Sequence, residues 1–251
     1  MNDSESQRVA LVTGGAVRVG RVLSLGLAAA GYDVVVNYRA SAGPAEEVAA
    51  DIAAIGRRCS LVQGDLADPE TAPVLAEHVQ ASFGRLDLLV NNAAAFDSRP
   101  LLDVDTEAWD AVMDLNVRGP HLLVRALAPL LAASRGSVVN ITDLSAFQAW
   151  TEYPHHAVSK AALAHLTRVQ ARALAPEVRV NAVAPGAVLP PDDYSPERME
   201  KLRAATPLQA LGTPEDVLDA VLFFAQAPFV TGQVLAVDGG RLLGPEGPPG
   251  E

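Results

Sequence analysis

The chain is poor in several residue types, and each shortage excludes a class of protein. Cys59 is the only cysteine among 251 residues, which excludes an internal disulfide and a cysteine-based metal site. No apolar run reaches the roughly 20 residues that a membrane-spanning helix needs. Residues 1–7 are polar and lack the apolar core of a signal peptide. We therefore expect a cytoplasmic protein with no membrane partner.

Positive charge is also scarce. The formal net charge is −11 and no basic run occurs, so nucleic acid and anionic membranes are not expected partners. Among the 19 basic residues only Lys160 and Lys201 are lysines. Because lysine shifts or shares its proton more readily than arginine does, a lysine here indicates a position that needs an ammonium, although chance also accounts for it. The five histidines show no ligand spacing with carboxylates, so no metal is expected.

What the chain does contain is a large apolar fraction arranged in alternating patterns. Hydrophobic residues make up 49% of the chain, and its length suits one domain with a sizeable core. We expect a single domain over residues 1–243, with a substrate loop at 187–205 that includes Pro190-Pro191-Asp192-Asp193. The Gly- and Pro-rich residues 244–251 are expected to form a disordered tail.

Short, nearly continuous apolar runs alternate with longer amphipathic stretches. The runs are Val9–Thr13, Asp33–Asn37, Ser60–Gly64, Leu86–Asn91, Ser137–Ile141, Val178–Val183 and Val234–Val237. The amphipathic stretches are Gly20–Ala30, Pro44–Ile55, Pro69–Phe83, Thr106–Ala133, Pro154–Leu174 and Pro214–Gln226. Continuous apolar runs are typical of parallel strands buried on both faces. The alternation predicts an α/β fold, a Rossmann-type doubly wound parallel sheet of seven strands in a three-layer α/β/α arrangement.

A glycine-rich turn, Thr13–Gly20, follows the first expected strand and opens the first expected helix. Glycines there permit a tight turn and close approach to a phosphate, while the helix N-terminus presents free N–H groups to the anion. Arg18 stands where a middle glycine is usual, and its guanidinium suits a phosphate. The alternative is a structural turn with a solvated arginine.

The end of the second expected strand, Asn37-Tyr38-Arg39-Ala40-Ser41, carries no carboxylate. A carboxylate there would hold the ribose 2′-hydroxyl of NAD, whereas an arginine accommodates a 2′-phosphate. Arg39, with Asn37 and Ser41, therefore favours NADPH, unless Arg39 is merely exposed.

Further motifs follow in order along nearly the whole chain. They are Asp65-Leu66, Asn91-Asn92-Ala93, Asn116, Ser159-Lys160, Pro185-Gly186 and Asp238-Gly239-Gly240. With the glycine-rich turn, they resemble the short-chain dehydrogenase/reductase family. The cofactor-binding residues that the motifs and the resemblance imply are Thr13, Gly14, Arg18, Val19, Asn37, Tyr38, Arg39, Ser41, Asp65, Leu66, Asn92, Ala93, Lys160, Pro185 and Gly186. The resemblance also implies a homotetramer assembled through the long helices near 106–133 and 154–174.

Three features are similar to a narrower group, the pteridine reductases and their bacterial relatives. Arg18 takes the second-glycine place, and Asn92–Phe96 resembles that group's strand-four exit, whose phenylalanine stacks a pterin against the nicotinamide. Asp143 stands where most of the wider family has serine and this group has aspartate. Phe96 as a simple loop anchor and Asp143 as an ordinary strand-end carboxylate remain alternatives. The substrate-binding residues implied are Phe96, Asp143 and Tyr194.

One position departs from the family. A tyrosine that donates a proton normally stands four residues before the active-site lysine, and here that position is His156. Residues i and i+4 share a helix face, so His156 lies beside Lys160. Imidazole is a capable general acid, and Asp143 would orient it as in half of a catalytic triad. The resemblance adds Asn116, so the expected catalytic set is Asn116, Asp143, His156 and Lys160.

The expected reaction is NADPH-dependent reduction of a pteridine or similar heterocyclic imine. An imine nitrogen is more basic than a ketone oxygen, so the loss of tyrosine costs such an enzyme less. A carbonyl or 3-oxoacyl reductase and a catalytically silent NADPH-binding protein are the alternatives. Tyr153, placed by Pro154 just before the helix, and Tyr194 are lesser candidates for the acid. His155 is expected at the surface.

Overall fold

The computed structural model describes residues 7–190 and 194–244. Its strands are β1 (Arg8–Thr13), β2 (Tyr32–Tyr38), β3 (Cys59–Gln63), β4 (Leu88–Asn91), β5 (Ser137–Ile141), β6 (Arg179–Pro185) and β7 (Val234–Val237). Its helices are α1 (Arg18–Ala29), α2 (Ala42–Ala54), α3 (Thr71–Phe83), α4 (Thr106–Met113), α5 (Gly119–Ala133), α6 (Pro154–Leu174), α7 (Pro196–Ala204) and α8 (Pro214–Gln226). Residues 1–6 of the polar N-terminus, Pro191-Asp192-Asp193 of the expected loop, and residues 245–251 of the expected tail lie outside the described residues.

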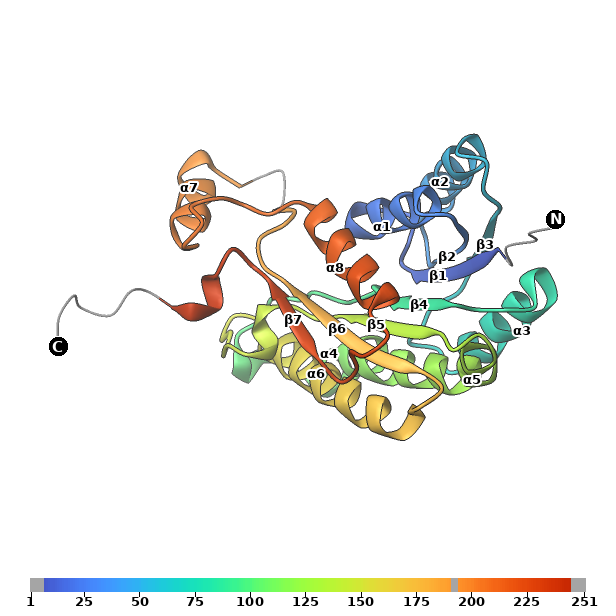
Figure 1. Ribbon diagram of the computed structural model, residues 1–251. Helices are drawn as coiled ribbons and strands as arrows, with labels where there is room; N and C mark the ends of the chain where they lie inside the picture. The colour runs from blue at the N-terminus through green and yellow to red at the C-terminus, as the bar shows by residue number, and fades with distance from the viewer. Residues whose placement is uncertain (1–6, 191–193, 245–251) are drawn as a thin grey trace.

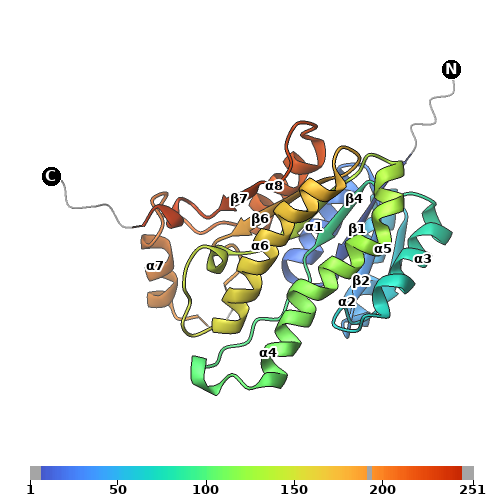
Figure 2. The same cartoon turned by 90° about the horizontal axis from the view of Figure 1, so that it is seen from below.

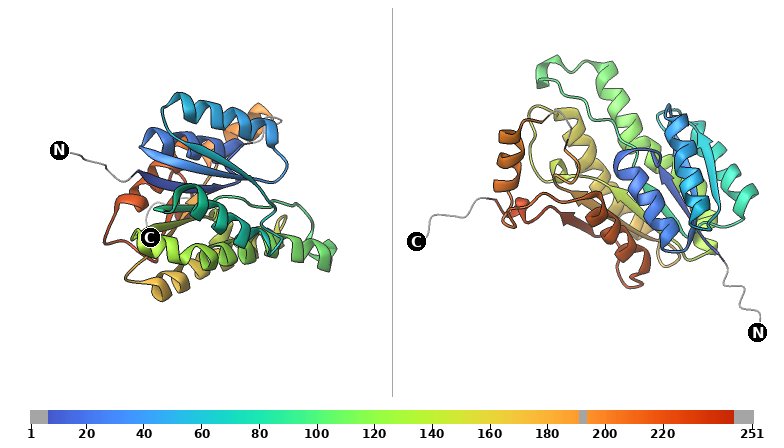
Figure 3. Two further views of the ribbon diagram at one scale, coloured as in Figure 1. Left: turned by 90° about the vertical axis from the view of Figure 1, so that its right-hand side faces the viewer. Right: turned by 90° about the horizontal axis from the view of Figure 1, so that it is seen from above.

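The seven strands form one parallel sheet in the order β3-β2-β1-β4-β5-β6-β7, which confirms the predicted fold class (Figure 1). Helices α1, α2 and α8 cover one face, and α3, α5 and α6 cover the other. Figures 2 and 3 show the layers from other directions, with α4 extending from α5 beyond the sheet. The strand order reverses between β1 and β4, and ligands of open α/β sheets bind at the carboxyl ends of the strands at such a point.

Central strands are mostly apolar because both faces of the sheet are covered. Leu11, Val35 and Leu89 are neighbours across β1, β2 and β4, and each is fully buried. These three side chains belong to the core on the α3/α5 face, whereas Val12 and Val34 belong to the core under α1 and α8. The continuous apolar runs of the sequence thus mark strands buried on two sides, as predicted.

The expected single helix over 106–133 is interrupted. Helix α4 ends at Met113, a π-helical turn η2 spans Asp114–Arg118, and α5 begins at Gly119. At Gly119 an added Cβ would lie 2.6 Å from the carbonyl oxygen of Leu66, so the chain passes too close for a side chain. A π turn inside a helix is common at functional sites, and this one carries Asn116.

The expected substrate loop also contains regular structure, because residues 196–204 form α7. The hydroxyl of Ser195 caps its first turn by accepting from the Arg198 amide at 3.3 Å, and Pro196 follows at the first helical position. Elsewhere the element limits agree with the sequence to within about two residues. Within the described ranges, no helix combines the length and apolar character needed to cross a membrane.

Candidate active site

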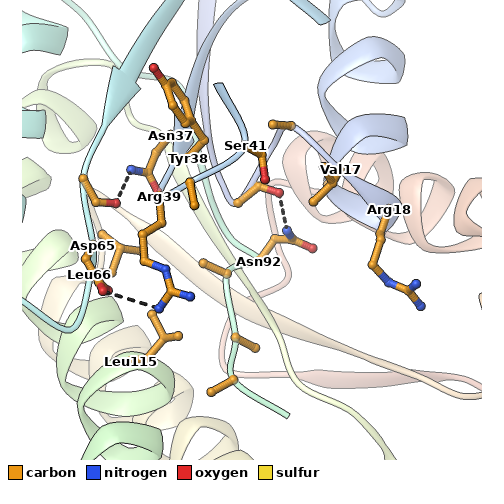
Figure 4. Close-up of a pocket in the computed structure, with 18 of the residues that line it drawn as sticks. Val17, Arg18, Asn37, Tyr38, Arg39, Ser41, Asp65, Leu66, Asn92 and Leu115 are labelled. Atoms are coloured by element: carbon orange, nitrogen blue, oxygen red, sulfur yellow. Dashed lines mark hydrogen bonds and ion pairs between the residues drawn. The ribbon is translucent and has the colours of Figure 1, made fainter. Parts of the chain in front are cut away.

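A cavity of about 470 Å³ opens at the carboxyl ends of the strands, where the strand order reverses. Figure 4 shows it between the glycine-rich turn, the end of β2 and the exit of β4. Eleven of the sequence-predicted cofactor residues line it: Gly14, Arg18, Val19, Asn37, Tyr38, Arg39, Ser41, Asp65, Leu66, Asn92 and Ala93. Thr13, Lys160, Pro185 and Gly186 do not. The adenosine and phosphate part of the predicted site is therefore one contiguous cavity.

The turn after β1 has a backbone shaped for close approach. Gly14 has φ +59°, and a Cβ there would lie 3.2 Å from the Cα of Ala93. At Gly20 an added Cβ would lie 2.1 Å from the carbonyl oxygen of Gly14, so the first turn of α1 packs directly on the loop. Arg18 adopts φ +52°, a left-handed conformation that is uncommon for a residue other than glycine.

The N-terminus of α1 retains free donors at the cavity. Its N-cap residue, Val17, forms no side-chain cap, and the first turn holds no acidic residue. Unsatisfied N–H groups and the positive end of the helix dipole therefore face the cavity, an arrangement that suits a pyrophosphate. The guanidinium of Arg18 donates to the carbonyl oxygen of Leu189 at 2.8 Å and so links this turn to the segment after β6.

Thr13 stabilises the cavity wall from behind. Its hydroxyl oxygen accepts from the backbone N–H groups of Asn92 at 2.9 Å and Ala93 at 3.0 Å. The amide of Asn92 donates back to the carbonyl oxygen of Thr13 at 2.9 Å. These bonds join the ends of β1 and β4, so Thr13 positions the site rather than lining it.

The far end of the cavity presents an arginine and no free carboxylate. Arg39 is 69% exposed and lies 3.5 Å from Asp65, its partner in an ion pair (Figure 4). Asn37 is buried and donates its amide N–H groups to the carbonyl oxygens of Val62 and Gly64, at 3.3 and 3.1 Å. Asn37 therefore ties β2 to β3, which leaves Ser41 and Arg39, the latter paired with Asp65, as the side chains that can meet a phosphate.

The catalytic candidates gather next to the cavity at Ala95, one of its lining residues. The backbone carbonyl oxygen of Ala95 accepts from Nδ1 of His156 at 2.9 Å and from the amide of Asn116 at 3.1 Å. The N–H of Ala95 donates to the side-chain oxygen of Asn116 at 2.8 Å. Three elements distant in sequence, the β4 exit, η2 and α6, thus meet at one residue, Ala95.

His156 also bonds Asp143, as the sequence predicts. Its Nε2 lies 2.6 Å from Oδ2 of Asp143, while the other carboxylate oxygen accepts from the backbone N–H and the hydroxyl of Ser145. Burial by itself raises the pKa of Asp143. The hydrogen bond from His156, the positive charges of Lys160 and His156 and the Ser145 bond outweigh it, so the pKa lies below its ordinary value.

Lys160 is buried one helical turn after His156 and donates to the carbonyl oxygen of Ile141 at 2.9 Å. Burial lowers the pKa of Lys160 below its ordinary value, and the Asp143 carboxylate counteracts part of that shift. No hydrogen bond joins the side chains of Asn116 and Lys160. Its amide donates instead to the hydroxyl of Ser159 at 2.9 Å, and that hydroxyl donates to the carbonyl oxygen of His156 at 2.7 Å.

The predicted substrate residues are placed differently from one another. Phe96 is 59% exposed, stacks on Tyr153 with ring centroids 4.3 Å apart, and lies nearly perpendicular to the His156 ring with centroids 4.7 Å apart. Phe96 thus contacts two rings and still remains more than half exposed. The ring of Tyr194, just before α7, lies under the guanidinium of Arg198, with the guanidinium carbon 3.7 Å from the ring centroid.

Two predicted cofactor residues lie at the end of β6. Pro185 is the last residue of that strand, and a Cβ added to Gly186 would lie 2.9 Å from the Cα of Asp238.

The expectation that His155 lies at the surface is wrong. His155 is fully buried, with Nε2 3.3 Å from Oδ2 of Asp97, rather than at the surface. Asp97 also pairs with Arg99 at 2.7 Å. The segment after β4 folds over the first turn of α6 and covers this ring, a contact between residues 58 positions apart.

Sequence reasoning missed several lining residues, namely Ala16, Val17, Gly20, Ala40, Gly64, Ala94, Ala95 and Leu115. Most are glycine or alanine, which carry no functional group that a sequence could reveal. Gly20 had a signal, since it closes the glycine-rich turn. Ala95 had none, although its carbonyl oxygen organises the catalytic cluster.

Comparison with known proteins extends over nearly the whole chain. The family described as enoyl-(acyl carrier protein) reductase matches residues 15–241. L-Rhamnose 1-dehydrogenase (NAD(P)(+)) from Sphingomonas sp. (strain SKA58) is 35% identical, with 94% of this chain and 96% of that protein covered. A 3-oxoacyl-[acyl-carrier-protein] reductase from Synechocystis sp. is also 35% identical, covering 94% and 97%. The crystal structure of FolM alternative dihydrofolate reductase 1 from Brucella suis in complex with NADP matches with a TM-score of 0.90 and 33% identity, covering 97% and 98%.

Proposed function

Because this chain belongs to the short-chain dehydrogenase/reductase family, we propose that it is an NADPH-dependent reductase of a pteridine or related heterocyclic imine. The observation that carries the proposal is the Asp143–His156 pair, joined at 2.6 Å where the family has its tyrosine. A hydrogen-bonded acid–base pair of this kind is more typical of an active enzyme than of a protein that has lost catalytic activity.

The residues of the cavity fit the cofactor. Gly20 leaves no room for a Cβ, Gly14 leaves little, and the uncapped N-terminus of α1 suits a pyrophosphate. Arg39 supports NADPH over NADH, because the end of β2 carries no carboxylate for a 2′-hydroxyl. The matched Brucella suis structure, which contains NADP, agrees with this assignment.

The cofactor, when bound, supplies the hydride, and the residues of the chain supply the proton and the alignment. His156, held by Asp143 and by the carbonyl oxygen of Ala95, is the source of the proton. Lys160 is held against the carbonyl oxygen of Ile141, and we assign it to the nicotinamide ribose. Asn116 fixes the Ala95 peptide from both its N–H and its carbonyl oxygen.

Pteridine reduction is supported by the exposed aromatic ring beside this acid. The exposed ring of Phe96 offers a stacking surface for a flat heterocycle, and it lies next to the His156 ring. The matched FolM structure is of an alternative dihydrofolate reductase, which also favours a pterin-type ring. Tyr194 is assigned to the same substrate from the α7 side.

The test is NADPH consumption by the purified protein with dihydropterins, dihydrofolate and several ketones, from about pH 5 to 8, the range in which imidazole titrates. We expect turnover of a pterin that is strongly reduced in Phe96→Ala, with Phe147→Ala, at a phenylalanine that is 48% exposed, as the aromatic control. Turnover of ketones alone would refute the pteridine assignment. NADPH binding without turnover of any substrate would indicate a silent cofactor-binding protein.

A second candidate is a carbonyl or 3-oxoacyl reductase. It is favoured by the Synechocystis relative, whose name states that activity. It predicts turnover of 3-oxoacyl thioesters, with little dependence on Phe96. The same assay therefore separates the two candidates.

We also propose a homotetramer built on α4, α5 and α6. Three exposed apolar side chains support an interface on these helices: Trp109 on α4, and Val158 and Val169 on α6, are 37%, 46% and 52% exposed. The molecular mass of the purified protein in solution, measured by light scattering, tests this proposal. A monomer at micromolar concentration would refute it.

A further inference from the structure

The first turn of α6 holds the segment after β4 at two places, one on each side of Phe96. His156 donates from Nδ1 to the carbonyl oxygen of Ala95 at 2.9 Å. His155, the preceding residue on the helix, bonds Asp97, with Nε2 3.3 Å from Oδ2. Because Ala95 and Asp97 are the two chain neighbours of Phe96, the adjacent histidines hold the chain on both sides of this aromatic residue.

The His155 ring makes this contact from a fully buried position. Its side chain is 0% exposed, and because a carboxylate can only accept, Nε2 donates to Asp97. Within residues 7–190 and 194–244, the buried Nδ1 has no hydrogen-bond partner, so Asp97 is the one partner of the ring in that part of the chain. Burial of a polar ring costs stability, and packing alone would therefore favour an apolar side chain at this position.

The carboxylate of Asp97 is itself held in place. Nε of Arg99 lies 2.7 Å from Oδ2 of Asp97, the same oxygen that His155 contacts. The backbone N–H of Arg99 donates to the carbonyl oxygen of Glu152 at 3.1 Å, and the hydroxyl of Ser98 donates to that oxygen at 3.3 Å. Residues 97–99 are therefore tied to the chain just before α6 as well as to the first turn of that helix.

The ring of Phe96 is oriented from the same end of α6. It stacks on Tyr153, the N-cap residue of the helix, with centroids 4.3 Å apart, and it lies 4.7 Å from the His156 ring. It nevertheless remains 59% exposed, next to Ala95, which lines the cavity. An exposed side chain on a loop loses rotamer freedom when a ligand stacks on it, and holding the ring beforehand removes part of that cost.

We propose that His155 and Asp97 are positioning residues whose bond holds Phe96 ready to stack on the substrate ring. The inference rests on the proposed pteridine reductase function. Neither residue lines the cavity, so the pair acts through Phe96. Ordering a stacking surface strengthens the binding of the substrate and of the transition state alike. The pair therefore sets the KM for the pterin and leaves kcat unchanged.

The first test replaces the buried ring with an apolar side chain. His155→Leu fills the buried space but cannot bond Asp97. We expect the KM for the pterin to rise about 2- to 10-fold, the value of an aromatic stacking pair. Both kcat and NADPH affinity should stay within about twofold of the wild type. His155→Gln, whose amide can donate to Asp97, should restore most of the KM. His165→Leu, at an exposed histidine on the same helix, is the matched control and should change none of these values.

A double-mutant cycle tests whether the effect passes through Phe96. It is measured as the dissociation constant of the pterin from the NADP⁺-bound protein, so that it does not depend on residual turnover. In the Phe96→Ala background, His155→Leu should cause no further weakening, because the ring that it positions is gone. Equal weakening in both backgrounds, or unchanged pterin affinity in His155→Leu itself, would overturn the proposal.

Asp97→Ala breaks the same bond from the side of the loop, where the carboxylate is 41% exposed. It should weaken pterin binding as much as His155→Leu does, and the two changes together should do no more than either alone. If His155→Leu fails to bind NADPH and is therefore misfolded, Asp97→Ala decides the question. Unchanged pterin affinity in a folded Asp97→Ala would then refute the role of the pair.

A measurement without substrate separates this inference from the proposed function. Amide hydrogen exchange over residues 95–99 should be faster in His155→Leu and in Asp97→Ala than in the wild type, whereas His165→Leu should match the wild type. Equal exchange in all four proteins would show that the pair does not hold the segment. If the wild type turns over no pterin while exchange changes as expected, the proposed function fails and the positioning of the segment stands.

Discussion

Replacing Arg39 with alanine is expected to remove the preference for NADPH without unfolding the protein. The side chain is 69% exposed, and its ion pair with Asp65 spans 3.5 Å, so truncation costs at most about 1 kcal/mol of stability, as for exposed pairs generally. A charged hydrogen bond to a 2′-phosphate contributes about 1.5–3 kcal/mol. At 1.4 kcal/mol for each factor of ten, NADPH affinity should fall about 10- to 150-fold.

The measurement is a fluorescence titration of the variant with NADPH and with NADH. We expect NADH affinity to change by less than about threefold, because NADH has no group for Arg39 to hold. Arg21→Ala is the matched control: Arg21 is also exposed and ion-paired, to Asp51 at 2.7 Å, but it does not line the cavity. Equal weakening of both cofactors in Arg39→Ala, or no weakening of NADPH, would refute the assignment of Arg39 to the phosphate.

Three other changes test the site from different sides. Gly20→Ala should abolish cofactor binding and lower the melting temperature, because its Cβ would lie 2.1 Å from a carbonyl oxygen, whereas Gly43→Ala in α2, with nothing within 4 Å, should be neutral or stabilising. Arg18→Ala should speed amide hydrogen exchange around Leu189, whose carbonyl it holds at 2.8 Å, and unchanged exchange would contradict that link. Because the folded-state pKa of Asp143 lies below its ordinary value, its stabilising contribution is complete above about pH 4 and is lost as the pH falls toward the folded pKa. Replacing it with asparagine should therefore flatten the pH dependence of unfolding free energy below pH 4, and an unchanged slope would argue against the shift.

The positions of the strands and most helices could be predicted because their signals are local. A strand buried on both faces needs an unbroken apolar run, and Ser137–Ile141 and Val234–Val237 have the predicted limits. Helix α6 begins at Pro154 and ends at Leu174, as expected from a proline at its first position. The break at 114–118 was missed, since the apolar periodicity continues through the π turn without interruption.

The burial of His155 shows why adjacent residues can defeat sequence reasoning. His155 and His156 are neighbours on α6, and both are buried, although no helix pattern would place two successive polar rings inside. The segment after β4 supplies the cover, with Asp97 contacting one ring and the Ala95 carbonyl contacting the other. These contacts depend on where a distant loop lies, which periodicity does not encode.

The sequence by itself determined the parallel α/β fold, the glycine-rich cofactor turn, the absence of a carboxylate at the end of β2, and the histidine in the tyrosine position. These features follow from local chemistry, namely side-chain type, spacing and backbone freedom. Only the tertiary structure decided that His156 bonds Asp143 and Ala95 at once, since Ala95 lies 61 positions away and acts through its backbone. Backbone acceptors are identical in every residue. Which one meets a side chain is decided only when the chain is folded.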